Sequence, residues 1–214
     1  MKKGCDLLVI KSDDRLVEYI LGYYMHCNTA WSEVDHVLMP VHMETLNHWI
    51  LVHFDIHSRC LHVYNSLRSA SHDKKAKKIV ERYSVIIPLL LDLVCFYKSR
   101  NDIELSSQYF VNKKATDCLE IMMVDGLSQQ TQCDCGVFVF AFAEYFIHGA
   151  TDKLKDLCVK DKRNKLCVDL YKHACKKQLE GYESDSEFPG RLKDNEIKGL
   201  ILEAKEDEES ELKK

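Results

Sequence analysis

Residues 129–140 read Gln129-Gln130-Thr131-Gln132-Cys133-Asp134-Cys135-Gly136-Val137-Phe138-Val139-Phe140. In this stretch a polar loop ends in a cysteine, and the apolar run from Cys135 to His148 predicts a long buried helix that opens close to Cys135. A thiol at the start of a helix lies near the positive end of the helix dipole and near unpaired amide hydrogens, both of which favour the nucleophilic thiolate. The next residue, Gly136, leaves room for a substrate backbone to approach. Cys135 is therefore the candidate nucleophile.

A nucleophilic thiolate needs a partner that takes and returns its proton. Among the ten histidines, His48 is the best placed by context, because it heads the β-rich segment 48–56. Asn65 closes the next such segment, 60–65. If these segments are adjacent strands, the amide oxygen of Asn65 can accept the ring N–H of His48 and fix its tautomer and orientation.

The rest of the chain predicts alternating helical and β-rich segments. From Asp73 onward the spacing is helical, and Pro88 falls where a second helix could begin with proline in its first turn, so we predict two consecutive helices. The other expected elements are a helix over 13–25, strands near 34–43, 48–56, 60–65 and 119–124, and helix over 151–179.

The composition indicates one globular unit with an acidic end. A chain of 214 residues with 46% hydrophobic residues can hold one ordinary domain plus a tail. Residues 178–214 carry 12 Asp and Glu against 6 Lys and Arg, a balance of −6, so the remainder of a chain with net charge −4 sums to about +2. We expect a folded domain over 1–178, a disordered tail over 179–214, and no binding of nucleic acid.

The sequence contains no apolar stretch of the roughly 20 residues that a bilayer span requires, and its first residues do not resemble a signal peptide. Ten cysteines without an export signal are more typical of reduced thiols than of a disulfide framework. We therefore expect an intracellular protein, in the nucleus or the cytoplasm, that does not associate with membranes.

Three motifs in order resemble the SUMO-specific, ubiquitin-like-protein protease family, which is related to the adenovirus protease. They are His48-Trp49, Tyr64-Asn65-Ser66-Leu67, and the glutamine-rich loop into Asp134-Cys135-Gly136. The resemblance covers about residues 30–148 and is nearest to the plant members, in which a similar Leu-Arg-Ser follows the third catalytic position. It implies a papain-like cysteine protease fold of the α+β class. In this fold a central mixed or antiparallel sheet is flanked by helices, and the nucleophile opens a buried helix.

The resemblance also implies roles for individual residues. His48 matches the catalytic histidine of the family, Asn65 its aspartate and Cys135 its nucleophile. Gln129, six residues before the cysteine, matches the glutamine that stabilises the oxyanion, and Trp49 matches the tryptophan that covers the Gly-Gly end of the substrate.

The sequence departs from the family pattern in three places. Asn65 stands where aspartate is usual, and it cannot stabilise imidazolium by charge, although papain-like enzymes use asparagine as an orienter. The glutamine loop is one residue shorter than in many relatives, so Gln130 is an alternative oxyanion donor. Only 47 residues precede His48, and we therefore expect the domain to be shortened at its amino end.

By resemblance the chain is a monomeric cysteine-type peptidase that cleaves after the Gly-Gly end of a ubiquitin-like protein. SUMO maturation or deconjugation is the first expectation, and neither a metal nor an organic cofactor is needed. Zinc is also disfavoured by the residues themselves, because the chain has no Cys-x2-Cys pair. Two alternatives remain: a catalytically weak or inactive domain that binds a ubiquitin-like protein, and a transposon-derived protease of unknown substrate.

Overall fold

The computed structural model describes residues 15–23 and 29–181, and they fall into two compact units. One unit contains described residues up to Asp35 together with Ser84–Leu119. The other contains His36–Tyr83 and the described chain from Glu120 onward. Every candidate site residue lies in this second unit, which is called the sheet unit below.

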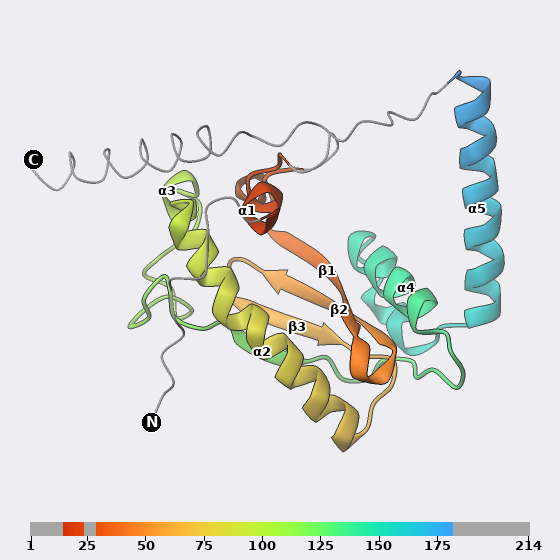
Figure 1. Ribbon diagram of the computed structural model, residues 1–214, viewed down its shortest axis with the longest axis horizontal. Coiled ribbons are helices and arrows are strands. Elements are labelled where there is room, and N and C mark those ends of the chain that lie inside the picture. Colours follow the sequence, from red (N-terminus) through yellow and green to blue (C-terminus); the bar gives the residue numbers. More distant parts are fainter. Residues whose placement is uncertain (1–14, 24–28, 182–214) are drawn as a thin grey trace, which may run out of the picture. The chain divides into compact units, whose positions relative to one another are not determined.

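The sheet unit is built on a four-stranded mixed sheet with the strand order β1-β2-β3-β4 (Figure 1). The strands are β1 (His36–Met43), β2 (His48–Asp55), β3 (Cys60–Tyr64) and β4 (Glu120–Met123). β1, β2 and β3 are antiparallel neighbours, whereas β4 runs parallel to β3. All four predicted strands are therefore confirmed, and so is the α+β class with a central mixed sheet.

Helix α4 (Cys135–Ile147) begins at Cys135, as predicted, and packs against β2. Phe138 and Phe142 of this helix form a buried cluster with Leu51 of β2 and Tyr64 of β3. Burying a phenylalanine side chain contributes about 1.5–3 kcal/mol, so this cluster fixes α4 on the sheet. The prediction that the helix is buried on most sides was only partly right. Phe140 is 43% exposed and Ile147 is 69% exposed, so one face of α4 is open in the described structure.

Residues 70–93 form one continuous helix, α2 (Ala70–Leu93), and the prediction of two consecutive helices was wrong. Pro88 lies inside this helix and has no N–H to donate to the carbonyl of Ser84, four residues earlier. That carbonyl instead accepts the N–H of Leu119 at 2.9 Å. Because the N–H of Leu119 satisfies the Ser84 carbonyl, proline is tolerated in the interior of α2.

The remaining helices are α1 (Arg15–Ile20), α3 (Phe96–Ser99) and α5 (Val159–Leu179), with short 3₁₀ turns at Trp31–Glu33, Glu44–Leu46 and Thr151–Lys155. α1 covers residues 15–20 of the helix expected over 13–25 and is followed by a turn at residues 21–22. The helix expected over 151–179 is divided between a 3₁₀ turn and α5. Most of the expected acidic tail lies outside the described residues. None of the described helices is long and apolar enough to cross a membrane.

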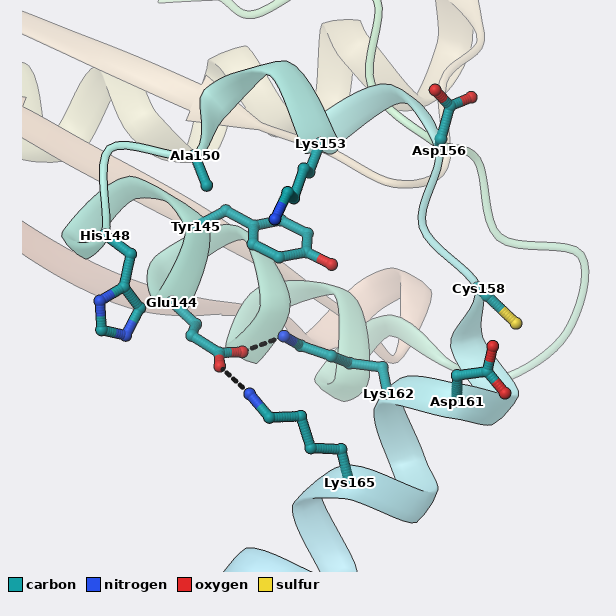
Figure 2. A pocket seen from close by; sticks show the side chains of 10 residues that line it. All are labelled: Glu144, Tyr145, His148, Ala150, Lys153, Asp156, Cys158, Asp161, Lys162 and Lys165. Carbon is teal, nitrogen blue, oxygen red and sulfur yellow. Dashed lines mark hydrogen bonds and ion pairs between the residues drawn. The ribbon is translucent and has the colours of Figure 1, made fainter.

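Helix α5 is attached to α4 by ion pairs. Figure 2 shows Glu144 of α4 between Lys162 and Lys165 of α5, and the Lys165 contact measures 2.8 Å. Hydrogen bonds from Lys162 first and Lys165 second lower the pKa of Glu144. These groups line a pocket of about 500 Å³ that contains none of the candidate catalytic residues.

Three histidines from neighbouring strands lie together on the sheet face that α4 covers. His53 of β2 is 5% exposed, its Nε2 lies 3.1 Å from Nδ1 of His36, and its ring stacks on His62 at 5.2 Å and packs against Phe146 of α4 at 4.3 Å. Burial, followed by the neighbouring His36 and His62, lowers the pKa of His53 to about 4.

The low pKa of His53 predicts a loss of stability in mild acid. Between the ordinary histidine pKa of 6.5 and about 4, the unfolded chain binds a proton that the folded chain excludes. The free energy of unfolding should therefore fall as the pH drops through this window, by about 2 kcal/mol from this residue at pH 5. Urea denaturation at pH 7.5 and pH 5 measures the effect. His53→Phe should have a clearly shallower pH dependence than the wild type, and equal dependences would contradict the prediction.

Candidate active site

His48 and Asn65 meet at one end of the sheet, as predicted. His48 is the first residue of β2, and Asn65 follows the last residue of β3. Nε2 of His48 lies 2.9 Å from Oδ1 of Asn65, and the two side chains are 2% and 0% exposed. The turn before β2 ends at Asn47 in the left-handed conformation (φ 46°), which asparagine adopts more readily than most residues. This turn aligns Met43 with His48 and starts β2 at the imidazole.

The second nitrogen of the His48 ring, Nδ1, is buried and has no hydrogen-bond partner among the described residues. Burial lowers the pKa of His48, the Asn65 hydrogen bond raises it, and the neighbouring His72 lowers it, with a net downward shift. The imidazole is therefore neutral at pH 7. A buried, unpaired ring nitrogen is unusual in a folded protein, and a neutral one can accept a proton.

Cys135 is the first residue of α4 and is half-buried. The carboxylate of the preceding Asp134 is held by Arg163 of α5, and the Asp134 carbonyl accepts the N–H groups of Val137 and Phe138. Phe138, one helical turn after Cys135, packs in the same cluster as Leu51 and Tyr64.

This packing places the start of α4 at the end of the sheet that carries the candidate imidazole. Leu51 is three residues from His48 along β2, and Tyr64 directly precedes Asn65. In the structure the Cys135 thiol is not hydrogen-bonded to Nδ1 of His48. The candidate nucleophile and the candidate base thus lie toward the same end of the sheet and are not hydrogen-bonded to each other.

The two candidate oxyanion donors differ in their hydrogen bonds. The side chain of Gln129 is fully engaged: its Oε1 accepts the N–H of Arg68 at 2.8 Å, and its Nε2 donates to the carbonyls of Leu127 at 3.0 Å and Ser128 at 3.4 Å. Gln130 accepts the hydroxyl of Ser66 at its Oε1, at 3.0 Å. Its Nε2 has no partner among the described residues.

The loop after β3 and the loop before α4 are joined by further contacts that sequence reasoning did not identify. The backbone N–H of Gln130 donates to the carbonyl of Ser66 at 2.8 Å. The guanidinium of Arg68 donates to the carbonyl of Val124 at 2.7 Å and, through Nε, to Asp73 at 2.8 Å. Hydrogen bonds therefore connect the loop that follows Asn65 to the glutamine loop and to Val124.

Trp49 and Gly136, the expected substrate contacts, are both exposed. Trp49 is 41% exposed and its ring lies 4.7 Å from that of His42, its partner across β1 and β2. A Cβ atom added at Gly136 would have no heavy atom of the described chain within 4 Å. The chain's own packing therefore does not require glycine at this position. In the described part of the sheet unit, no three His, Cys, Asp or Glu side chains converge as metal ligands.

A mixed sheet with a cysteine opening the helix packed on it, and a buried His-Asn pair at the sheet end, define the papain-like cysteine protease fold. The family model for the Ulp1 protease family, C-terminal catalytic domain, matches residues 22–178. The chain belongs to this family.

Two solved structures are similar to the chain. Both are of the SUMO protease Ulp1, with the catalytic cysteine oxidized to a sulfonic acid in one and to a sulfenic acid in the other. Each is 18% identical, covers 63% of this chain, and has a TM-score of 0.35 or 0.36. The chain spans about half the length of either protein, since 50% of each is covered. No curated protein sequence matches the chain.

Proposed function

We propose that the chain is a cysteine peptidase that cleaves after the Gly-Gly end of a ubiquitin-like modifier, with SUMO-type precursors and conjugates as the first candidates. The observation that carries the proposal is the hydrogen bonding of the two ring nitrogens of His48. Its Nε2 is fixed on Asn65, while its buried Nδ1 has no partner within residues 15–23 and 29–181, at the end of the sheet where α4 begins with a cysteine. The membership in the Ulp1 protease family supports the choice of substrate class.

In the proposed reaction Nδ1 of His48 takes the proton of the Cys135 thiol, and the sulfur attacks the carbonyl carbon after the second glycine. The imidazolium then gives this proton to the leaving amine, and the bond between carbonyl and nitrogen breaks. Water, activated by the same ring nitrogen, hydrolyses the thioester and releases the modifier. Hydrogen bonds between catalytic groups often form only in the substrate complex, and this mechanism requires the Cys135 thiol to approach Nδ1 of His48 there.

We assign the oxyanion donor to Gln130 rather than to Gln129, together with the backbone N–H of Cys135. A donor must have a free N–H aimed at the developing charge. The amide nitrogen of Gln129 is already bonded to two carbonyls, whereas that of Gln130 has no partner in the described ranges and its oxygen is held by Ser66. The shorter glutamine loop is consistent with this one-residue change.

Trp49 is the proposed cover for the two glycines of the modifier. Its indole is partly exposed and held in place by His42. An extended Gly-Gly segment has no side chains, so it fits beneath an aromatic ring where any larger residue would clash. Gly136 would keep the opposite side of such a channel open.

Cleavage assays on a panel of modifier precursors test the proposal: SUMO, ubiquitin and other ubiquitin-like proteins that end in Gly-Gly followed by a short extension. We expect the wild type to release the extension from a SUMO-type precursor. Cys135→Ala should abolish the release, and the matched variant Cys133→Ala, two residues away at an exposed thiol, should retain it. Binding of a modifier without cleavage of any precursor would instead identify a catalytically silent binding domain.

A further inference from the structure

In the family pattern the third catalytic residue is a negatively charged aspartate, where this chain has the neutral Asn65. A carboxylate, that of Asp73, is instead hydrogen-bonded to Asn65. Nδ2 of Asn65 donates to Oδ1 of Asp73 at 3.3 Å. Asp73 lies in the first turn of α2, and its side chain is 25% exposed. A carboxylate thus stands directly behind the neutral asparagine.

The partners of Asn65 determine how its amide is oriented. Asp73 as a carboxylate can only accept, so the NH2 group of Asn65 must face it. The backbone N–H of Leu67 can only donate, and it bonds to Oδ1 of Asn65 at 3.0 Å. Both constraints direct the Asn65 oxygen toward His48.

This orientation selects the tautomer of His48. An oxygen facing Nε2 at 2.9 Å requires that Nε2 carries the hydrogen. A neutral imidazole with hydrogen on Nε2 has its lone pair on Nδ1, the buried nitrogen that has no described partner. The chain of hydrogen bonds from Asp73 through Asn65 therefore leaves His48 as a base at the nitrogen that the proposed reaction uses.

We propose that Asp73 is a positioning residue of the active site, which acts through Asn65 to hold the Nε2–H tautomer of His48 and to stabilise the imidazolium when it forms. This inference rests on the proposed function, and it adds a residue to the array of Cys135, His48 and Asn65. The negative charge polarises the Asn65 amide and makes its oxygen a stronger acceptor.

Arg68 fixes Asp73 in this position. Its Nε donates to Oδ2 of Asp73 at 2.8 Å, so the other carboxylate oxygen is left for Asn65. Arg68 also pairs with Asp125 at 3.1 Å, but Asp125 is 88% exposed and has no described contact with Asn65. His72 of α2 also lies near His48, and its proximity contributes to the lowered pKa of His48.

The arrangement predicts a cost for aspartate at position 65. Asn65→Asp removes the donor to Asp73 and places two carboxylates about 3 Å apart, where like charges disfavour joint ionisation. The double variant Asn65→Asp/Asp73→Asn keeps one carboxylate and one amide in reversed order. It should be more active than Asn65→Asp alone.

The test combines histidine NMR with kinetics on the full chain. Two-bond ¹H–¹⁵N spectra, with the His48 signals assigned from His48→Gln, report its tautomer and pKa without any need for turnover. We expect wild-type His48 to be in the Nε2–H form. Asp73→Asn should lower the pKa of His48 further and reduce kcat/KM on the cleaved precursor by about 10-fold, the lower end of the range found for outer partners of metal-bound histidines. Asp125→Asn, which removes the other carboxylate on Arg68, should leave both readouts at the wild-type values.

An unchanged His48 tautomer, pKa and kcat/KM in Asp73→Asn would overturn the inference while leaving the proposed function intact. A wild type that cleaves no precursor would defeat the proposed function, and the NMR readout would still decide whether Asp73 controls His48. Should Asp73→Asn not fold, the comparison of Asn65→Asp with Asn65→Asp/Asp73→Asn replaces it. Equal activity of these two variants then counts against the role of Asp73.

Discussion

His48→Gln should reduce kcat/KM on the cleaved precursor by about 10²–10⁴-fold, the usual contribution of a positioned general base. Glutamine has a comparable length, and its amide N–H can still donate to Oδ1 of Asn65, so the buried contact at this position can be kept. What glutamine lacks is the basic lone pair that Nδ1 supplies. Steady-state kinetics on the precursor, with Tm as a check on folding, measures the effect.

Residues that act as one unit lose activity non-additively. The double variant His48→Gln/Cys135→Ser should therefore be no less active than Cys135→Ser alone. His173→Gln, at an exposed histidine of α5, is the matched control and should retain full activity. If the losses of His48→Gln and Cys135→Ser multiply, the two residues work independently and the proposed proton transfer between them is wrong.

Gln130→Ala should lower kcat by about 10²–10³-fold, the effect of removing one oxyanion donor, with a smaller change in KM. The physical reason is that its Nε2, which no described residue engages, can donate to the tetrahedral oxygen, whereas its Oε1 is already held by Ser66. Single-turnover kinetics, which separate the chemical step from binding, give the cleanest measurement.

Gln129→Ala serves as the comparison at the neighbouring residue. Its side chain connects the two loops through Arg68, Leu127 and Ser128, so its loss should lower the free energy of unfolding by about 1 kcal/mol per hydrogen bond. Its effect on kcat should be much smaller than that of Gln130→Ala. The reverse order of kcat effects would return the oxyanion role to Gln129.

Much of the site could be predicted from the sequence because its key residues stand at ends of regular elements. The segments around 48–56 and 60–65 are rich in β-branched and aromatic residues, which predicts strands, and their antiparallel pairing brings His48 to Asn65. The switch from polar loop to apolar run likewise marks the start of α4 at Cys135. In each case the local sequence pattern shows where the strand or helix begins or ends, and this places His48, Asn65 and Cys135.

The remaining features depend on contacts between segments far apart in sequence, which local patterns do not encode. The hydrogen bonds of Gln129 and Gln130 are set by Ser66 and Arg68, about 60 residues earlier. Similarly, α2 continues through Pro88 because Leu119, 31 residues later, satisfies the carbonyl of Ser84. A propensity rule that predicts a helix break at proline has no access to this donor.

Covalent trapping tests most directly whether Cys135 is the nucleophile and is activated by His48. The wild-type chain is incubated with a SUMO-type modifier whose carboxyl end carries a vinyl sulfone, and the modified residue is identified by peptide mass spectrometry. We expect a single adduct on Cys135, formed much more slowly in His48→Gln. An adduct on another cysteine, or equal labelling of the wild type and Cys135→Ser, would contradict it.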